Sequence, residues 1–292
     1  MDYSQVISEE NRGLFIITID QSGSMLSPFQ NVSMITTKSE IASMIASTII
    51  DELVLRSQKE FRISDPCPYC DIAVIGYSRN EVTSLIHDST YVLPITALNP
   101  NKHPVKCRTI EYVTKDNHLD LILETWREWV EPKAVGITPT ADMLSVVTKI
   151  VSEWCYNRRN QDSFPPIIIN ITDGLERYEY TRDVKTLSNI IKNTGTKYGK
   201  TLFFNVCISD TPRNERLDFP SPKDIEPSHP IAYLASISSE LPTKFYPVAR
   251  QFNKGSKPPY VCVCYNAAIL QILADLKFNL RWDSWKYTAF IR

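Results

Sequence analysis

Two short runs of almost wholly apolar residues limit the folds open to this chain. Residues 14–19 read Leu-Phe-Ile-Ile-Thr-Ile, and residues 167–171 read Ile-Ile-Ile-Asn-Ile. A strand with one face in water alternates polar and apolar residues, whereas a strand covered on both faces is apolar almost throughout. We therefore expect both runs to be strands inside a largely parallel sheet that has helices on each side.

Helical patterns separate the strand patterns along the chain. Apolar spacing favours helices over residues 41–53, about 140–154 and 184–197. Thr37 and Glu40 have the spacing of a capping box just before the first of these helices. Further strands are expected at 71–77, 82–87, 201–208 and 260–265. This alternation predicts an α/β fold, with a doubly wound, mainly parallel central sheet flanked by helices in a Rossmann-like arrangement.

The other segments have weaker patterns. We expect a polar loop with an edge strand over 88–117, a helix over 119–129, a short helix at 232–237 and a strand near Phe245. A helix is expected over 267–276. No change of composition resembles a linker, so we predict one enlarged domain over 1–292. Its core spans about 14–247, and its C-terminal strand, helix and aromatic tail span about 258–292.

The composition excludes several classes of function. The chain has 292 residues, 43% of them hydrophobic, and a formal net charge of −1. Such a chain is expected to fold, and a balance of charge near zero does not favour general nucleic-acid or membrane-surface binding. No stretch has the roughly 18–20 apolar residues of a membrane span. Without a visible secretory signal, and with an odd number of cysteines (seven), a reducing cytoplasm is the expected location.

One pair of cysteines, Cys67 and Cys70, has the spacing of a glutaredoxin-like redox motif. In those proteins the motif opens a helix, whose N-terminus lowers the thiolate pKa. Here the motif follows a helical pattern and leads into a strand pattern, so redox activity is disfavoured. Zinc is also disfavoured, because Cys262 and Cys264 have the wrong gap for a second ligand pair.

Three loops carry the polar residues best suited to a functional site. Asp20-Gln-Ser-Gly-Ser follows the first strand, Gly136-Ile-Thr-Pro-Thr precedes a helix, and Thr172-Asp-Gly follows a central strand. In doubly wound sheets, ligands bind beyond the carboxyl ends of the strands. Only eight glycines occur in the chain, yet each of these loops contains one. Carboxylates and hydroxyls without His or Cys favour Mg²⁺, Mn²⁺ or Ca²⁺ over zinc.

These motifs, D-x-S-x-S, G-x-T-P-T and T-D-G in this order, resemble the metal-ion-dependent adhesion site of von Willebrand factor A-type (vWA) domains. The resemblance implies that Ser22 and Ser24 coordinate a metal through their hydroxyls, and that Thr138 does so directly or through water. It also implies that Asp20 and Asp173 act on the metal, either directly or through a bound water. The family often has two glycines before the threonine, whereas this chain has Ile137 in the second place.

Two carboxylates would about neutralise a divalent cation, and neutral hydroxyl ligands would leave that cation electrophilic. An Asp or Glu side chain from a partner protein could then replace a bound water. We therefore expect a non-catalytic, Mg²⁺-dependent protein interaction module, with Mn²⁺ or Ca²⁺ as alternatives. Neither a nucleic acid nor a membrane is an expected partner.

Enzymatic alternatives have weaker support. Haloacid dehalogenase-like phosphatases need a second Asp where this chain has Ser22, and that Asp is their general acid. The four histidines, His87, His103, His118 and His229, lie in no recognisable triad motif, and no nucleotide-binding P-loop is present. A metal-dependent hydrolase is kept as an alternative.

The partner is less well defined by the sequence. Freestanding bacterial vWA proteins of the tellurite-resistance-associated type, which work with phosphatases and kinases, are the favoured resemblance, and chelatase-like companions of AAA+ ATPases are the alternative. The tail 281–292 is rich in aromatic residues. We expect it to cover apolar surface of the domain, with a partner-binding role as the alternative.

Overall fold

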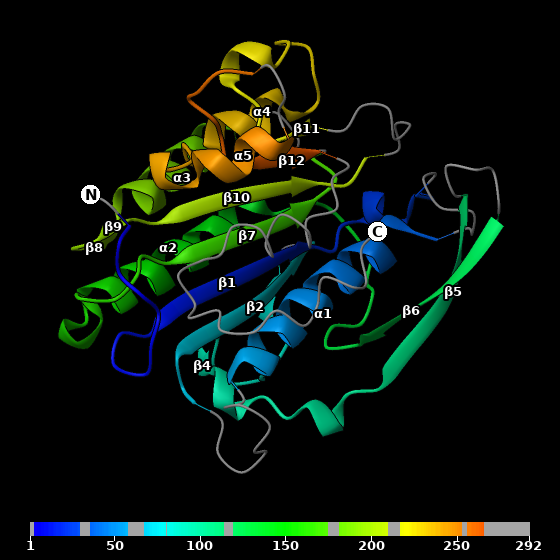
Figure 1. The fold of residues 1–292 in the computed structure, drawn as a ribbon, viewed down its shortest axis with the longest axis horizontal. Coiled ribbons are helices and arrows are strands. Elements are labelled where there is room, and N and C mark those ends of the chain that lie inside the picture. The colour runs from blue at the N-terminus through cyan, green and yellow to red at the C-terminus, as the bar shows by residue number, and fades with distance from the viewer. Residues whose placement is uncertain are drawn as a thin grey trace.

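A computed structural model describes residues 3–29, 36–57, 67–79, 81–113, 119–174, 181–209, 217–252 and 256–265 (Figure 1). Its helices are α1 (Lys38–Ser57), α2 (Thr140–Tyr156), α3 (Thr181–Asn193), α4 (Ile231–Ile237) and α5 (Tyr246–Phe252). The strands are β1 (Gly13–Asp20), β2 (Cys70–Ser78), β3 (Glu81–Ser84), β4 (Leu93–Pro94), β5 (Val105–Val113), β6 (Leu119–Arg127), β7 (Ile167–Thr172), β8 (Gly195–Thr196), β9 (Gly199–Lys200), β10 (Leu202–Cys207), β11 (Leu217–Asp218) and β12 (Val263–Tyr265).

One large sheet organises the molecule. Its strand order is β11-β12-β10-β7-β1-β2-β3, with β4 also paired to β2. The five strands from β12 to β2 are parallel, and β11, β3 and β4 are antiparallel additions at the edges. The predicted class, α/β with a mainly parallel central sheet flanked by helices, is confirmed.

The two faces of the sheet explain the apolar runs. In β1, Phe15 and Ile17 pack into a core shared with α1, whereas Leu14 and Ile16 pack into a core shared with α2, α3 and α4. Because both faces are covered, every residue of β1 is buried. The helix pattern after Thr37 is confirmed as α1, and its capping box forms: Thr37 N donates to Glu40 Oε2 (2.7 Å), and Glu40 N donates to Thr37 Oγ1 (3.2 Å).

A chain of buried polar side chains crosses the sheet at Asn170 of β7. Asn170 Oδ1 accepts hydrogen bonds from Thr18 Oγ1 (2.8 Å) and from the Tyr77 hydroxyl (2.9 Å). Asn170 Nδ2 donates to Asn205 Oδ1 (2.9 Å), and Asn205 Nδ2 donates to Ser238 Oγ (2.9 Å). The single polar residue in the apolar run 167–171 therefore joins four elements, β1, β2, β7 and β10, to the end of α4.

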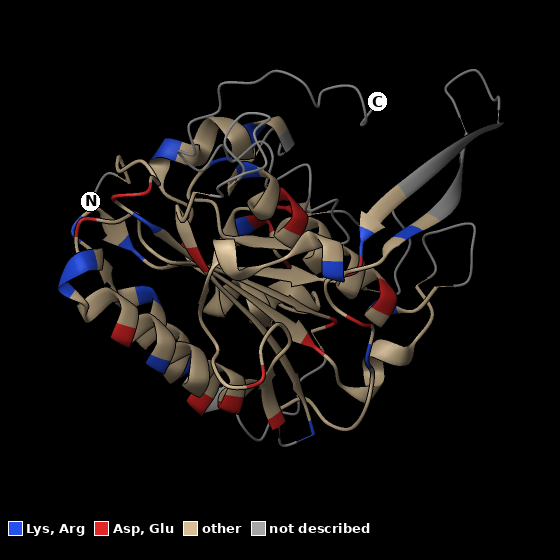
Figure 2. Ribbon diagram, turned by 90° about the horizontal axis from the view of Figure 1, so that it is seen from below, with Lys and Arg blue, Asp and Glu red and all other residues tan. Residues whose placement is uncertain are grey.

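The prediction of a helix over residues 119–129 is wrong. Residues 119–127 form β6, which pairs antiparallel with β5 from Val105↔Arg127 to Val113↔Leu119, so the segment 88–117 holds a long strand. Leucines at 119, 121 and 123 fit a strand, whereas 119, 122, 123 and 126 fit a helix, and a short apolar run does not decide between them. Antiparallel pairing with β5, the preceding strand in the chain, makes this segment a strand, and the two strands extend beyond the main sheet as a hairpin (Figures 1 and 2).

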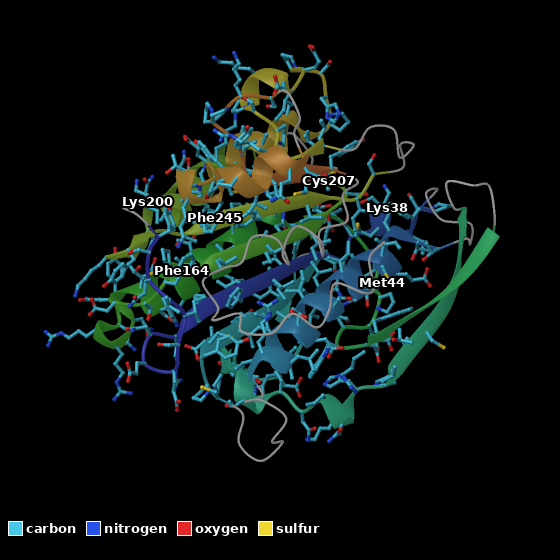
Figure 3. The ribbon with its side chains drawn as sticks, in the orientation of Figure 1. Lys38, Met44, Phe164, Lys200, Cys207 and Phe245 are labelled. Carbon is cyan, nitrogen blue, oxygen red and sulfur yellow. The ribbon has the colours of Figure 1, made fainter. Side chains whose placement is uncertain are left out.

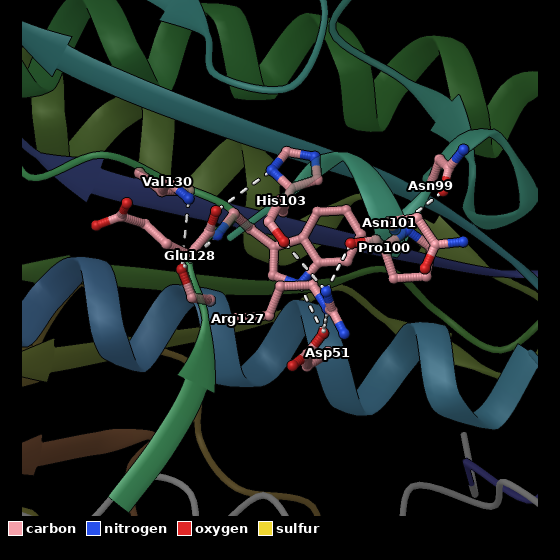
Figure 4. A network of polar contacts seen from close by, with 10 residues as sticks. Asp51, Asn99, Pro100, Asn101, His103, Arg127, Glu128 and Val130 are labelled. Carbon is pink, nitrogen blue, oxygen red and sulfur yellow. Dashed lines mark hydrogen bonds and ion pairs between the residues drawn. The ribbon is translucent and has the colours of Figure 1, made fainter. Parts of the chain in front are cut away.

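The base of this hairpin is fixed to α1 through Arg127 (Figure 4). Arg127 Nη1 donates to the carbonyl oxygens of Pro100 (2.6 Å) and His103 (3.1 Å), and Arg127 Nε lies 3.4 Å from Asp51 Oδ1. The Trp129 indole donates to the same Asp51 oxygen (2.7 Å). The charge of Arg127 thus links β6, the loop before β5 and α1.

The prediction of a strand near Phe245 is also wrong. Residues 243–245 form a 3-10 turn that leads directly into α5. Pro242 precedes this turn, and the Phe245 backbone N–H donates to its carbonyl oxygen (2.9 Å), which stabilises a helical turn in place of a strand. The helix expected over 267–276 and the aromatic tail 281–292 lie outside the described residues.

Charged residues of both signs are interspersed over the described ribbon (Figure 2). This distribution agrees with the nearly balanced composition. No helix in the described ranges has the length and apolarity needed to cross a membrane.

Candidate functional site

The three polar loops meet where β1 and β7 end. The backbone N–H of Gly23 donates to the Gly136 carbonyl oxygen (2.8 Å), which joins the first loop to the second. The Thr172 hydroxyl donates to Asp20 Oδ2 (2.8 Å), which joins the end of β7 to the end of β1. Loops far apart in the sequence therefore form one cluster at the carboxyl edge of the parallel strands, where such sheets bind ligands.

Asp20, the last residue of β1, has a completely buried carboxylate. Its Oδ1 atom accepts a hydrogen bond from the Ser22 backbone N–H (2.9 Å), and Oδ2 accepts the bond from Thr172. Burial raises the pKa of Asp20 to about 6, although the hydrogen bonds from Ser22 and Thr172 oppose the shift; the nearby charge of Asp173 also raises it. Burial therefore makes the ionised form of Asp20 costly in the metal-free protein.

Ser22 and Ser24 have their hydroxyl oxygens 3.0 Å apart. Two ligands at right angles on Mg²⁺, each at about 2.1 Å, would have their oxygens about 3.0 Å apart. Ser22 is buried and Ser24 is partly exposed, so one side of this pair can be reached from solvent. The spacing of the hydroxyls fits a small divalent cation.

Thr138 lies in the second loop, half-buried. With Thr172, Asn170 and Tyr77 it lines a small cavity of about 10 Å³, which is room for about one water molecule. Gly136 has a φ of +79°, and a Cβ there would lie 2.2 Å from Arg79 Cγ, so the turn into this loop requires glycine.

Ile137, which stands where the vWA pattern often has a second glycine, is 45% exposed. Its carbonyl oxygen accepts a hydrogen bond from the Arg79 backbone N–H (2.8 Å). The substitution thus points a side chain toward solvent and leaves Thr138 within the cluster.

Asp173 has a partner that the sequence patterns do not reveal. The Lys38 ammonium lies 3.2 Å from Asp173 Oδ2, and the two side chains are only 3% and 0% exposed. Lys38 is the first residue of α1, at the end of the sheet where β10 finishes with Cys207 (Figure 3). The capping box at Thr37 and Glu40 indicates where α1 begins, but it does not indicate that Lys38 reaches Asp173.

The donor set as a whole fits a hard divalent cation. It offers two carboxylates and three hydroxyls, and such oxygen ligands are preferred by Mg²⁺, Mn²⁺ and Ca²⁺. No group of three or more His, Cys, Asp and Glu side chains able to hold a metal occurs among the described residues, and the candidate site itself has only two carboxylates, the remaining donors being hydroxyls. Ser22, Ser24, Thr138, Asp20 and Asp173 stay the predicted ligands, with the Lys38 ammonium as an additional charge beside Asp173.

The Cys67–Cys70 motif lies in a context unlike that of a redox site. Cys70 is the first residue of β2 and is fully buried, and burial raises the pKa of its thiol well above the ordinary value. Cys67 is partly exposed and its Sγ lies 3.4 Å from Glu9 Oε2. A redox-active pair needs a stabilised thiolate, and the burial of Cys70 opposes one.

Thiol labelling of the native protein is expected to follow burial. Cys107 is exposed and should react with iodoacetamide first, with Cys67 next; the other five cysteines are buried and should react only after unfolding. Mass spectrometry of peptides after timed labelling measures the order, and Cys107→Ser should remove the fastest reaction. Rapid labelling of Cys70 would contradict this prediction.

The described histidines have local or packing roles. His103 stacks on Trp129 with ring centroids 4.2 Å apart, and His229 packs edge-on against Tyr265 at 4.9 Å. His87 Nδ1 lies 3.2 Å from Ser89 Oγ within an exposed turn. His118 lies outside the described residues.

Two solved structures resemble the fold at low scores. A crystal structure of manganese-loaded Plasmodium vivax TRAP protein is 13% identical, with a TM-score of 0.42, and the match covers 94% of this chain and 76% of that chain. An aerotolerance-related membrane protein from Bacteroides fragilis, with multiple mutations to serines, is 15% identical, with a TM-score of 0.32 and coverage of 67% of each chain. No protein-family model matches the sequence, and no match among curated proteins reaches significance.

Proposed function

We propose that this chain is a metal-dependent protein interaction module of the vWA type, with Mg²⁺ as its resident cation and Mn²⁺ or Ca²⁺ as substitutes. The observation that carries the proposal is the convergence of Asp20, Ser22, Ser24, Thr138 and Asp173 at one edge of the sheet, in the order of the adhesion-site motifs. When bound, the cation would supply an electrophilic centre for a carboxylate from a partner protein.

The serines and Asp20 would have different roles at the cation. Ser22 and Ser24 provide neutral ligands, which leave the cation with more positive charge than carboxylates would. Asp20 holds the first loop in place through its bond to the Ser22 N–H while contributing negative charge. Because no acid–base pair accompanies these groups in the motif, the proposed role is binding rather than catalysis.

The proposed biological role is that of a regulatory or scaffold subunit in a cytoplasmic bacterial stress or signalling system. Phosphatases or kinases of the tellurite-resistance-associated type are the proposed partners, each offering an Asp or Glu. The resemblance of the three loop motifs to the adhesion site supports this assignment.

Binding of Mn²⁺ and of acetate, as a minimal carboxylate, tests the proposal. Bound Mn²⁺ should enhance water proton relaxation, and acetate should then reduce the enhancement by replacing a water. Ser24→Ala removes a partly exposed hydroxyl and should weaken Mn²⁺ binding about tenfold or more, since a six-coordinate ion loses one ligand. Ser236→Ala, at an exposed serine of α4, is the matched control.

The outcomes separate the two parts of the proposal. Equal Mn²⁺ binding by the wild type and Ser24→Ala would reject Ser24 as a ligand. Binding of Mn²⁺ without any response to acetate would reject recognition through a carboxylate.

A further inference from the structure

Lys38 places a positive charge where a bound metal ion would need negative charge. Its ammonium lies 3.2 Å from Asp173 Oδ2, and both side chains are almost entirely out of water. An ammonium at this depth is favourable only beside a carboxylate. Asp173 is therefore the counter-ion of Lys38 in the metal-free protein, and it is also the proposed metal ligand after β7.

The position of Lys38 is fixed by the backbone. Its N–H donates to the Ser27 carbonyl oxygen (3.1 Å), directly after the 3-10 turn Gly23–Leu26 that follows Ser22. The capping box at Thr37 fixes the start of α1 on the other side. The loop with the serine ligands and the helix that carries Lys38 are thus joined by direct hydrogen bonds.

Coulomb energies decide how the two cations affect one another. A divalent ion and an ammonium that share one buried carboxylate repel each other strongly, because the effective dielectric constant there is far below that of water. The divalent ion and the ammonium cannot both stay in contact with the Asp173 carboxylate, so the cation with the more favourable interactions displaces the other.

We propose that Lys38 is an internal competitor for the metal: its ammonium takes the cation position at Asp173 in the metal-free protein and must withdraw when a divalent cation binds. This inference rests on the proposed metal-binding function. Its consequence is a site with lower affinity than its oxygen ligands alone would give, so that the site fills only when the free cation is plentiful.

Mn²⁺ titrations of the full chain, followed by the loss of the free-ion electron paramagnetic resonance signal, test this inference. Lys38→Met keeps most of the length of the side chain and removes its charge, and Lys38→Gln serves as a second neutral variant should Met reduce folding. Both should bind Mn²⁺ about tenfold or more tightly than the wild type, because the repulsion is removed. Lys149→Met is the matched control, since it removes one positive charge from a side chain that is 77% exposed.

Each outcome has a defined meaning. Tighter binding by the neutral variants, with Lys149→Met unchanged, supports the inference. Equal or weaker binding by both neutral variants would overturn it while leaving the metal site intact. Absence of Mn²⁺ binding in the wild type and both variants would overturn the proposed function itself. Binding by the neutral variants alone would support Lys38 as a competitor and overturn metal dependence of the native chain.

Discussion

Replacing Asp173 by Ala in the metal-free protein is expected to lower the free energy of unfolding by about 3–5 kcal/mol, because a buried ammonium then loses its carboxylate. The contact between Lys38 and Asp173 is almost wholly shielded from water. Urea unfolding in the presence of EDTA, followed by circular dichroism, measures the change.

An exposed ion pair offers a matched control for this variant. Lys197 and Asp162 are closer, at 2.7 Å, but their side chains are 61% and 53% exposed. Asp162→Ala should therefore cost no more than about 1 kcal/mol. Adding Lys38→Met to Asp173→Ala should recover part of the lost stability, because the double variant no longer buries the Lys38 ammonium without the Asp173 carboxylate. If Asp173→Ala and Asp162→Ala lowered the free energy of unfolding equally, the claim that the buried pair of Lys38 and Asp173 stabilises the protein would be contradicted.

Asn170→Leu is expected to destabilise the sheet by at least about 3 kcal/mol, since three buried polar groups lose a bond and each loss costs about 1–3 kcal/mol. The affected groups are the hydroxyls of Thr18 and Tyr77 and the Oδ1 atom of Asn205. Leu has the same branched skeleton of heavy atoms as Asn and opens no cavity, so the loss reports the polar bonds together with the cost of fitting two larger methyl groups into the core. The same urea titration measures it.

Asn189→Leu is the control, because Asn189 is an exposed residue of α3. Its effect should stay within about 0.5 kcal/mol, as for other surface substitutions. If Asn170→Leu cost no more than Asn189→Leu, the polar chain across the sheet would not contribute to stability.

The sequence predicts the parts of the fold that depend on local pattern. The apolar runs of β1 and β7 identify strands covered on both faces, and Thr37 with Glu40 marks the start of α1. The hairpin of β5 and β6 is missed, because its backbone is determined by pairing between segments whose own patterns suit a helix or a loop. Likewise, Asn170 looks like an exception within an apolar run until its neighbours on other strands are known.

The candidate site also has features that the sequence predicts and one that it does not. The ligand types and their loops can be read from the sequence, since each loop follows a strand or precedes a helix. Lys38 cannot be found by motif, because its role comes from the direction in which α1 leaves the sheet. That one lysine changes the expected charge around Asp173, and hence the expected affinity for metal.

The most direct test of the central claim is a Mn²⁺ titration of the wild-type chain and Asp20→Ala. The account predicts one saturable Mn²⁺ per wild-type chain and loss of that site in Asp20→Ala, with both proteins folded by circular dichroism. Binding of the same stoichiometry and affinity by folded Asp20→Ala would contradict it.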